Sequence, residues 1–430
     1  MTAKIFFLLS LIPVLWAGAL MIVKDQYVGE PSGSVITFGS LDIFLILLLY
    51  LILYALIWLI YKGIFCKKTV TLSFFPTIHF NVTKVHFVFF AVLCFQLFAL
   101  LYEGAGKDIV NPASPVSHSI LYNISNIFHT DSFILIYYLF CRDGKKIYRL
   151  NILLYLIFRV MCGWTGDILT IAILELFCQE REKGYIYNII RRIGIYKSMV
   201  IFFLGGALLY TIFYPLKFSI RYGVDYADLM GLIFSSSYSL DYWDAAEKLI
   251  SRLSFFPTAV LGFQNADLIA DLYQSTGIFL SETLSFFRPL IPSFIFDYKD
   301  SIYPIPALLA SSEYSIYIPD MNSSTNAGFI AYNYILFQCD PIDYFCSLIL
   351  SIVLAALFIG LLGSMIKGNN KCVNDVSILY LSWMLGILKS GSNEMLYAYK
   401  YLGILYMLVV LYFTGALVLR RKNKTYNGVI

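Results

Sequence analysis

Long apolar runs, separated by short polar segments, recur along the whole chain. A helix needs about 20 mostly apolar residues to cross the hydrocarbon core of a membrane. Six runs reach roughly that length, namely residues 5–23, 41–61, 85–102, 199–217, 342–366 and 395–419. Four shorter or interrupted runs cover residues 119–140, 147–162, 164–178 and 376–388. The pattern predicts an all-α polytopic membrane protein with about ten spans.

The basic residues divide the polar segments into two groups. If the N-terminus is inside, about two thirds of the 31 Lys and Arg residues fall on the cytoplasmic side, as the preference of Lys and Arg for cytoplasmic segments requires. The short loops on the opposite side hold only Lys24, Lys107 and Lys389. The first run lacks a small-residue cleavage site before Lys24, so we interpret it as an uncleaved first span. We therefore predict a multi-pass protein with both termini in the cytoplasm.

One connection is far longer than the others. Residues 218–327 form a predicted outer loop of about 110 residues, a length that normally indicates a functional segment. The loop carries five basic and twelve acidic residues, for a net charge of about −7, and is rich in aromatic residues. No internal repeat is visible. The chain, residues 1–430, is therefore predicted to be a single integral membrane domain with this loop inserted between spans.

Two segments of the loop show helical periodicity. Residues 241–256 place apolar and charged side chains on opposite faces of a helix. Residues 264–273 repeat the scheme, with Leu268 and Leu272 opposing two aspartates. These patterns predict amphipathic helices that lie on the bilayer interface or on the ends of the spans.

The composition excludes several classes of protein. Charged residues make up 13% of the chain and the mean hydropathy is +0.75, whereas a soluble domain carries about 25% charged residues. A soluble enzyme, a nucleic-acid binder and a disordered scaffold are excluded. The 8 cysteines and 4 histidines show no metal-ligand spacing, and no glycine-rich phosphate loop is present. We expect no metal and no cofactor.

Arginines are the most informative charges. The acidic loop keeps three of them, Arg221, Arg252 and Arg288. Arginine binds a diphosphate bidentately, although a solvated or ion-paired side chain is the alternative for each. Arg159 and Asp167 stand four residues on either side of Gly163, so a tight helical hairpin would pair them. A structural ion pair and a phosphate contact both stay open there. Glu175 is expected to reach the inner surface or Arg149.

Two stretches around the end of the loop carry a family resemblance. Residues 288–302 read RPLIPSFIFDYKDSI, and residues 322–337 read NSSTNAGFIAYNYILF. The matching residues are Ile291, Pro292, Phe294, Phe296, Asp297, Lys299, Ser323, Ser324, Thr325 and Gly328. With the many spans and one large outer loop, these stretches resemble the Wzy family of oligosaccharide repeat-unit polymerases, in which similar motifs end the large periplasmic loop.

The resemblance implies a bacterial inner-membrane glycosyltransferase of the GT-C type, independent of metal and nucleotide sugar. Such an enzyme moves a growing glycan from undecaprenyl diphosphate to the non-reducing end of a lipid-linked repeat unit, in O-antigen and lipopolysaccharide biosynthesis. A flippase and a chain-length regulator are the implied partners. We expect the diphosphate ligands among Arg159, Arg221, Arg252, Arg288 and Lys299. We expect the general base among Asp241, Glu282 and Asp297.

Two other functions stay open. An O-antigen ligase has a similar architecture and related chemistry, but ligases carry a histidine in the large periplasmic loop, and residues 218–327 contain none. A lipid-linked oligosaccharide flippase would be expected to have more spans, repeat symmetry and short loops. The polymerase is therefore the favoured function.

Overall fold

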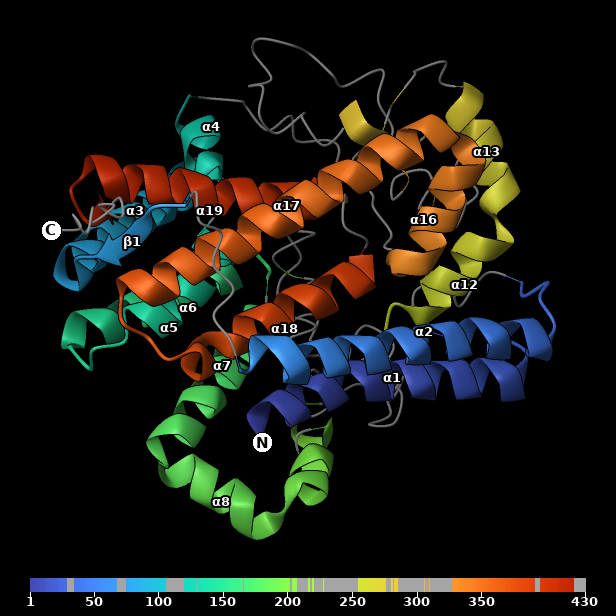
Figure 1. Ribbon diagram of the computed structural model, residues 1–430, viewed down its shortest axis with the longest axis horizontal. Coiled ribbons are helices and arrows are strands. Elements are labelled where there is room, and N and C mark those ends of the chain that lie inside the picture. The colour runs from blue at the N-terminus through green and yellow to red at the C-terminus, as the bar shows by residue number, and fades with distance from the viewer. Residues whose placement is uncertain are drawn as a thin grey trace, which may run out of the picture.

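The computed structural model is almost entirely helical (Figure 1). It describes residues 1–28, 35–67, 75–105, 120–128, 130–164, 166–201, 203–206, 216, 219, 227, 254–275, 280, 282–284, 305, 309, 327–390 and 395–420. The first helices are α1 (Thr2–Lys24), α2 (Ser40–Ile60) with the π-helical turn η1 (Tyr61–Phe65), α3 (Val82–Glu103), α4 (Ile120–Ile127), α5 (Thr130–Phe140), α6 (Lys146–Met161), α7 (Gly166–Glu182) and α8 (Tyr185–Ile193). The later helices are α12 (Phe256–Gln264), α13 (Ala266–Ser275), α16 (Gly328–Cys339), α17 (Pro341–Gly368), α18 (Val373–Ser390) and α19 (Met395–Phe413). Strands β1 (Thr77–Phe80) and β2 (Leu417–Arg420) pair antiparallel.

Four helices in the described residues are long and apolar enough to cross a membrane. They are α1, α2 together with η1, α3 and α17, and they coincide with four of the predicted spans. Much of their surface is exposed and apolar, as at Phe345, Ile349 and Ile352 of α17. Apolar surface of this extent is costly in water and is expected of a helix that faces lipid. The fold therefore supports a multi-pass membrane protein, and the count of about ten spans stays a prediction.

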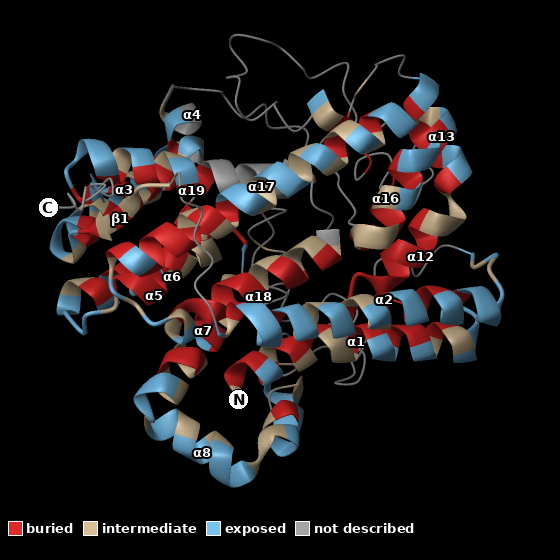
Figure 2. Cartoon of the chain, in the orientation of Figure 1, coloured by how far each residue is buried: buried red, intermediate tan, exposed pale blue. Residues whose placement is uncertain are grey.

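The shorter predicted runs also form helices. Helix α6 ends at Met161 and α7 begins at Gly166, on either side of Gly163, whose φ is +89°. The predicted hairpin is thus confirmed. Helix α18 contains the predicted run 376–388. It is a core helix, because Tyr380 and Leu381 are fully buried and much of the helix is coloured as buried in Figure 2. Burial on this scale shows that α18 packs mainly against protein.

The predicted run 119–140 is wrong as a single helix, because α4 and α5 are separate. The side chain of Gln96, buried in α3, explains how the break is tolerated. Its amide nitrogen donates to the carbonyl oxygens of Ser125 at 3.3 Å and Phe128 at 2.5 Å. Its amide oxygen accepts from the Thr130 hydroxyl at 2.9 Å. The carbonyls freed by the break therefore have a partner in the protein interior.

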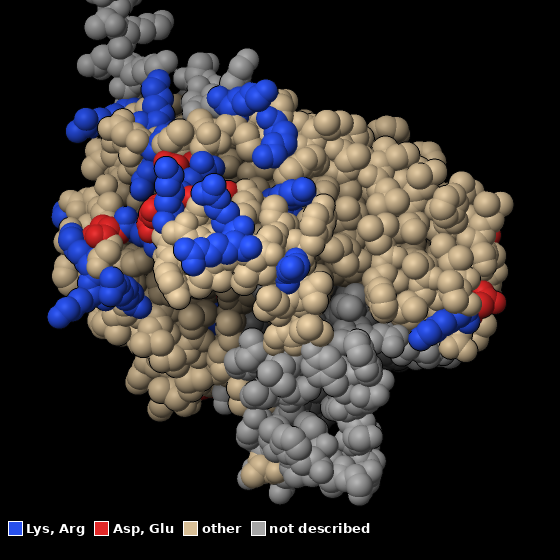
Figure 3. Space-filling model, turned by 90° about the horizontal axis from the view of Figure 1, so that it is seen from below, with Lys and Arg blue, Asp and Glu red and all other residues tan. Residues whose placement is uncertain are grey.

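Contacts between distant segments define one end of the molecule, which we call the basic end. There β1 pairs with β2, and the Asn369 side chain binds the backbone of Ile78 and Phe80. At the same end of the chain's long axis, Lys and Arg side chains gather over the surface (Figure 3). Exposed members include Lys62, Lys84, Lys145, Lys146, Arg149, Lys367 and Arg420. All of these residues belong to segments that the sequence predicts on the cytoplasmic side.

The opposite end, which we call the loop end, joins the first connection to the large loop. Gln264, the last residue of α12, accepts hydrogen bonds from the Tyr27 hydroxyl at 2.9 Å and the Thr37 amide at 3.0 Å. Its own amide donates to the Val35 carbonyl at 2.9 Å. Helix α12 thus lies beside the end of α1 and the start of α2 (Figure 1). Segments predicted on the outer side therefore contact one another.

Candidate functional site

Two of the eight predicted site residues, Glu282 and Arg159, lie in the described residues. The other six lie outside them, namely Asp241, Asp297, Arg221, Arg252, Arg288 and Lys299. Most of the predicted helix 241–256 is outside as well, and its last residue, Phe256, opens α12. The site is therefore built from Glu282 and the groups around it.

Helices α12 and α13 hold the described part of the large loop against the helix bundle. Phe256 of α12 is fully buried, and its ring packs against Tyr50 of α2 at a centroid distance of 6.1 Å. Helix α13 packs on α16 through Ile269 and Tyr273. Of the two predicted apolar residues, Leu272 packs against the core, whereas Leu268 is 50% exposed. The buried residues of the helix are Ala266, Ile269, Ala270 and Tyr273.

Gly328, the glycine of the resemblance motif, fixes where the loop returns to the bundle. Its φ of +73° lies in the left-handed region that disfavours side chains. A Cβ there would lie 2.6 Å from the Phe255 ring and 2.7 Å from the Tyr50 hydroxyl. Glycine is therefore required by both backbone conformation and space, where α16 meets α2 and the residue before α12.

Asp343 is a buried acid that the sequence reasoning missed. It lies in the first turn of α17 and is fully buried. Its Oδ2 accepts from the Tyr273 hydroxyl at 2.5 Å and the Glu282 amide at 2.8 Å. Its Oδ1 accepts from the Thr283 amide at 3.0 Å and the Thr283 hydroxyl at 2.5 Å. Four donors thus offset the cost of burying this carboxylate.

Glu282 belongs to the same cluster of buried polar groups as Asp343. Its side chain is fully buried. Its Oε1 accepts from the Tyr332 hydroxyl of α16 at 2.6 Å, and its Oε2 accepts from the Ile305 amide at 3.0 Å. Asp343 therefore holds the backbone of Glu282, while Tyr332 and Ile305 hold its carboxyl group. The cluster joins α13, α16 and α17 with Glu282, Thr283 and Ile305 of the large loop.

Burial sets the acidity of Glu282. Desolvation raises the pKa of its carboxyl group from 4.5 to about 7, and the nearby Asp343 charge adds to this effect. The hydrogen bonds from Tyr332 and Ile305 act in the opposite direction and lower the pKa. Each carboxylate oxygen accepts a hydrogen bond from one of these two groups. Glu282 can therefore exchange a proton near neutral pH, as a general base must.

Arg159 has two carboxylate neighbours. Its Nε donates to Asp167, so the predicted pair is confirmed. Its Nη2 lies 4.0 Å from Asp131 Oδ2, and its guanidinium lies 5.6 Å from the centre of the Trp164 ring. Arg159 is therefore already engaged by Asp167 and lies close to Asp131. The geometry favours the structural ion pair over the phosphate contact for this residue.

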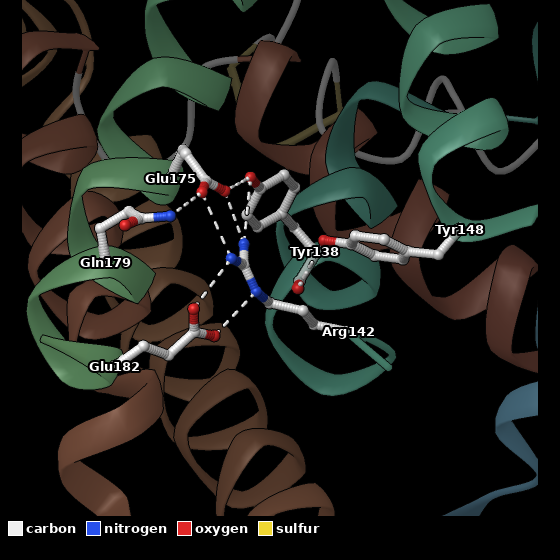
Figure 4. A network of polar contacts seen from close by, with 6 residues as sticks. All are labelled: Tyr138, Arg142, Tyr148, Glu175, Gln179 and Glu182. Carbon is white, nitrogen blue, oxygen red and sulfur yellow. Dashed lines mark hydrogen bonds and ion pairs between the residues drawn. The ribbon is translucent and has the colours of Figure 1, made fainter. Parts of the chain in front are cut away.

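A second network, towards the ends of α5 and α7, surrounds Arg142 (Figure 4). Arg142 donates to Glu175 at 2.5 and 3.2 Å and to Glu182 at 3.1 and 3.2 Å. The Tyr138 hydroxyl and the Gln179 amide also bind Glu175. Of the two alternatives for Glu175, the contact with Arg149 was wrong, because α7 turns this acid towards Arg142 at the end of α5. The network clamps these two helices together.

A buried histidine forms a third polar cluster that the sequence reasoning did not assign. His86 of α3 is fully buried, and its Nδ1 lies 2.7 Å from the Tyr137 hydroxyl. Its Nε2 lies 3.1 Å from Asp143 Oδ2. The Asn151 amide donates to the Tyr137 hydroxyl at 2.8 Å and to the His86 carbonyl at 2.9 Å. These contacts join α3, α5 and α6 in the protein interior.

No family model, curated protein or solved structure matches this chain. Its function is therefore argued from its own residues. Glu282 is the predicted site residue whose surroundings suit a chemical role, because it combines deep burial with a pKa near neutrality.

Proposed function

We propose that this protein polymerises undecaprenyl-diphosphate-linked oligosaccharide repeat units at the outer face of a bacterial inner membrane. The observation that carries the proposal is Glu282, a buried carboxyl group with a pKa raised to about 7, in the large loop at the end opposite the basic surface. The resemblance of residues 288–302 and 322–337 to the Wzy polymerases supports the same function. Gly328 of the second stretch has a clear structural requirement for glycine.

In the proposed reaction, Glu282 acts as the general base. Its carboxylate removes the proton from an acceptor hydroxyl at the non-reducing end of a lipid-linked repeat unit. That oxygen forms a bond to the anomeric carbon of the growing chain, and the bond from this carbon to undecaprenyl diphosphate breaks. The departing diphosphate takes the electron pair. The sugar–diphosphate bond of the donor supplies the driving force, so the reaction consumes no nucleotide.

Cations must stabilise the departing diphosphate. Arg221, Arg252, Arg288 and Lys299 are the proposed ligands, since Arg159 is already engaged by two carboxylates. These four residues belong to the same predicted loop as Glu282. Asp343 would act as a positioning residue, because it holds the Glu282 backbone amide.

The test is a gel of surface glycolipid from the host strain with the gene deleted and then restored on a plasmid. A polymerase predicts that the deletion leaves lipid A core capped by a single repeat unit. Bare core would instead indicate the flippase or the ligase. Lipid-linked repeats that accumulate on the cytoplasmic side would identify the flippase, and those on the periplasmic side the ligase.

The role of Glu282 is tested in the same strain by plasmids that carry single substitutions. Glu282→Gln should yield core capped by one repeat unit while the protein remains at its normal level in the membrane. Asp271→Asn, which changes an exposed acid of the neighbouring α13, should restore full polymer. Full polymer with Glu282→Gln would remove Glu282 from the reaction, and the deletion strain would still decide the function.

A further inference from the structure

Helix α8 (Tyr185–Ile193) is strongly amphipathic. At 100° per residue, four isoleucines fall within an arc of about 100°, namely Ile186, Ile189, Ile190 and Ile193. Arg191 and Arg192 lie about 110–150° from the centre of that arc, beside Asn188. The helix therefore has one purely aliphatic face and one cationic face.

The aliphatic face is largely unpartnered. No residue of α8 is buried, and Ile186, Ile189 and Ile193 are 38%, 37% and 37% exposed. Ile190 is half-buried and packs against the main core. Figure 2 shows α8 set apart from the bundle, below α7, with an exposed or intermediate surface throughout. The helix is thus held to the protein along one edge.

The turns at both ends fix the orientation of α8. At its start, the Gly184 amide donates to the Gln179 carbonyl at 2.8 Å, and a Cβ on Gly184 would lie 1.7 Å from the Gln179 side chain. At its end, Gly194 has a φ of +90°. Helix α7 in turn is tied to α1, where the Thr2 amide donates to Glu180 at 2.7 Å. The position of α8 is therefore defined by specific contacts.

Charge and apolar surface continue beyond the helix on both sides. Lys183 and Lys197 flank α8 and are exposed. Arg191 and Arg192, within the helix, are exposed as well. The following apolar stretch exposes Tyr196, Val200, Ile201 and Leu204. A protein partner would have to cover both the cationic and the aliphatic face, whereas one lipid surface supplies phosphate groups and acyl chains side by side.

We propose that α8 lies in the headgroup region of the bilayer and binds anionic phospholipid. Its isoleucines enter the acyl boundary, while Arg191 and Arg192 contact lipid phosphates, with Lys183 and Lys197 nearby. Each basic residue near an anionic membrane surface contributes about 1 kcal/mol of binding free energy. The two arginines therefore make α8 bind an anionic bilayer up to about 30-fold more tightly than a neutral one. This inference requires a membrane location and does not depend on the proposed reaction.

The experiment measures amide hydrogen exchange of residues 185–193 in the full-length protein. The protein is reconstituted into nanodiscs of phosphatidylcholine alone and of phosphatidylcholine mixed with phosphatidylglycerol. We expect the anionic lipid to slow exchange in α8 several-fold, up to about 30-fold. The double variant Arg191→Gln, Arg192→Gln should abolish this difference, because glutamine keeps the helix propensity and removes the charge.

The matched control is Lys145→Gln, Lys146→Gln, which removes two exposed charges elsewhere on the basic end and should preserve the lipid effect. Equal exchange in both lipids would overturn the proposal. So would protection that persists in detergent and grows with protein concentration, because a second copy of the chain would then cover the helix. Loss of the lipid effect in both double variants would also overturn it, since α8 would have no special role.

Discussion

Glu282→Gln is the substitution for which the structure makes the sharpest prediction about stability. Glutamine has the shape of glutamate, so it fits the same buried space. Its amide oxygen can accept from the Ile305 amide, and its nitrogen can donate to the Tyr332 hydroxyl, which serves as donor or acceptor. The substitution therefore removes the negative charge while both hydrogen bonds are kept.

The magnitude follows from the pKa of Glu282. Burial raises this pKa from 4.5 to about 7, so between those values the folded protein binds a proton that the unfolded chain has lost. Stability therefore falls as the pH rises through this window. Above it, the ionised carboxylate costs the folded state about 3 kcal/mol, and below it the cost disappears. Glutamine should relieve that cost, so the variant is expected to be more stable than wild type near neutral and alkaline pH.

The assay is chemical unfolding of the full-length protein in mixed micelles, from about pH 5 to pH 8. The free energy of unfolding of wild type should fall across this range relative to Glu282→Gln, with a difference that approaches about 3 kcal/mol. Asp271→Asn serves as the control, because that acid is exposed. A difference that does not change with pH would refute the raised pKa. A variant less stable than wild type at about pH 8 would show that the folded state needs the charge.

Three further substitutions test other contacts by the same unfolding measurement. Gly328→Ala should lower the free energy of unfolding by about 2–5 kcal/mol through backbone strain and overlap with its neighbours. Gly63→Ala is the control, because a Cβ there meets nothing within 4 Å, and it should be neutral or slightly stabilising. Equal effects of the two substitutions would refute the reasoning. Arg142→Gln should cost about 1–2 kcal/mol, since the Glu175 pair is partly exposed to solvent, and a double-mutant cycle with Glu175→Gln should show coupling between the two residues. Gln264→Leu removes three hydrogen bonds and should cost about 1–3 kcal/mol, with faster amide exchange in α12; unchanged exchange would contradict the anchoring role.

Features that depend on local pattern could be predicted from the sequence. The four long apolar helices and the hairpin around Gly163 follow from hydropathy and helix length alone. The Arg159–Asp167 pair followed because a tight hairpin fixes which residues face each other. In each case the partners are close in sequence, so chain geometry limits the possible arrangements.

Features that depend on tertiary packing could not be predicted. Asp343 binds Tyr273 and Glu282, more than 60 residues earlier in the chain, and its position at the start of an apolar run gives no indication of a partner. Glu175 meets Arg142 because α7 packs beside α5, a relation that periodicity does not contain. The burial of Ile269 and Tyr273 of α13 likewise depends on packing against α16, which periodicity does not contain.

If the protein forms polymer as proposed, the pH dependence of that reaction provides the most direct test of Glu282 as its general base. A general base must be ionised, so the rate catalysed by purified wild-type protein should rise as the pH passes about 7. The free energy of unfolding falls as the pH rises from 4.5 to about 7, because the charged carboxylate is unfavourable in the buried site. A proton-accepting group that destabilises its own fold is expected at a functional site and not at a purely structural contact.

Glu282→Gln should therefore give a protein that is more stable than wild type and yet forms no polymer. If Glu282 had only a structural role, any Glu282 variant that folds should still form polymer. Glu282→Asp provides the matched test, because it keeps the acid but withdraws it by one methylene from Tyr332 and Ile305. It should retain a reduced rate that still rises with pH. A wild-type rate that stays constant from about pH 6 to pH 8 would exclude Glu282 as the base, whatever the gel shows about polymerisation.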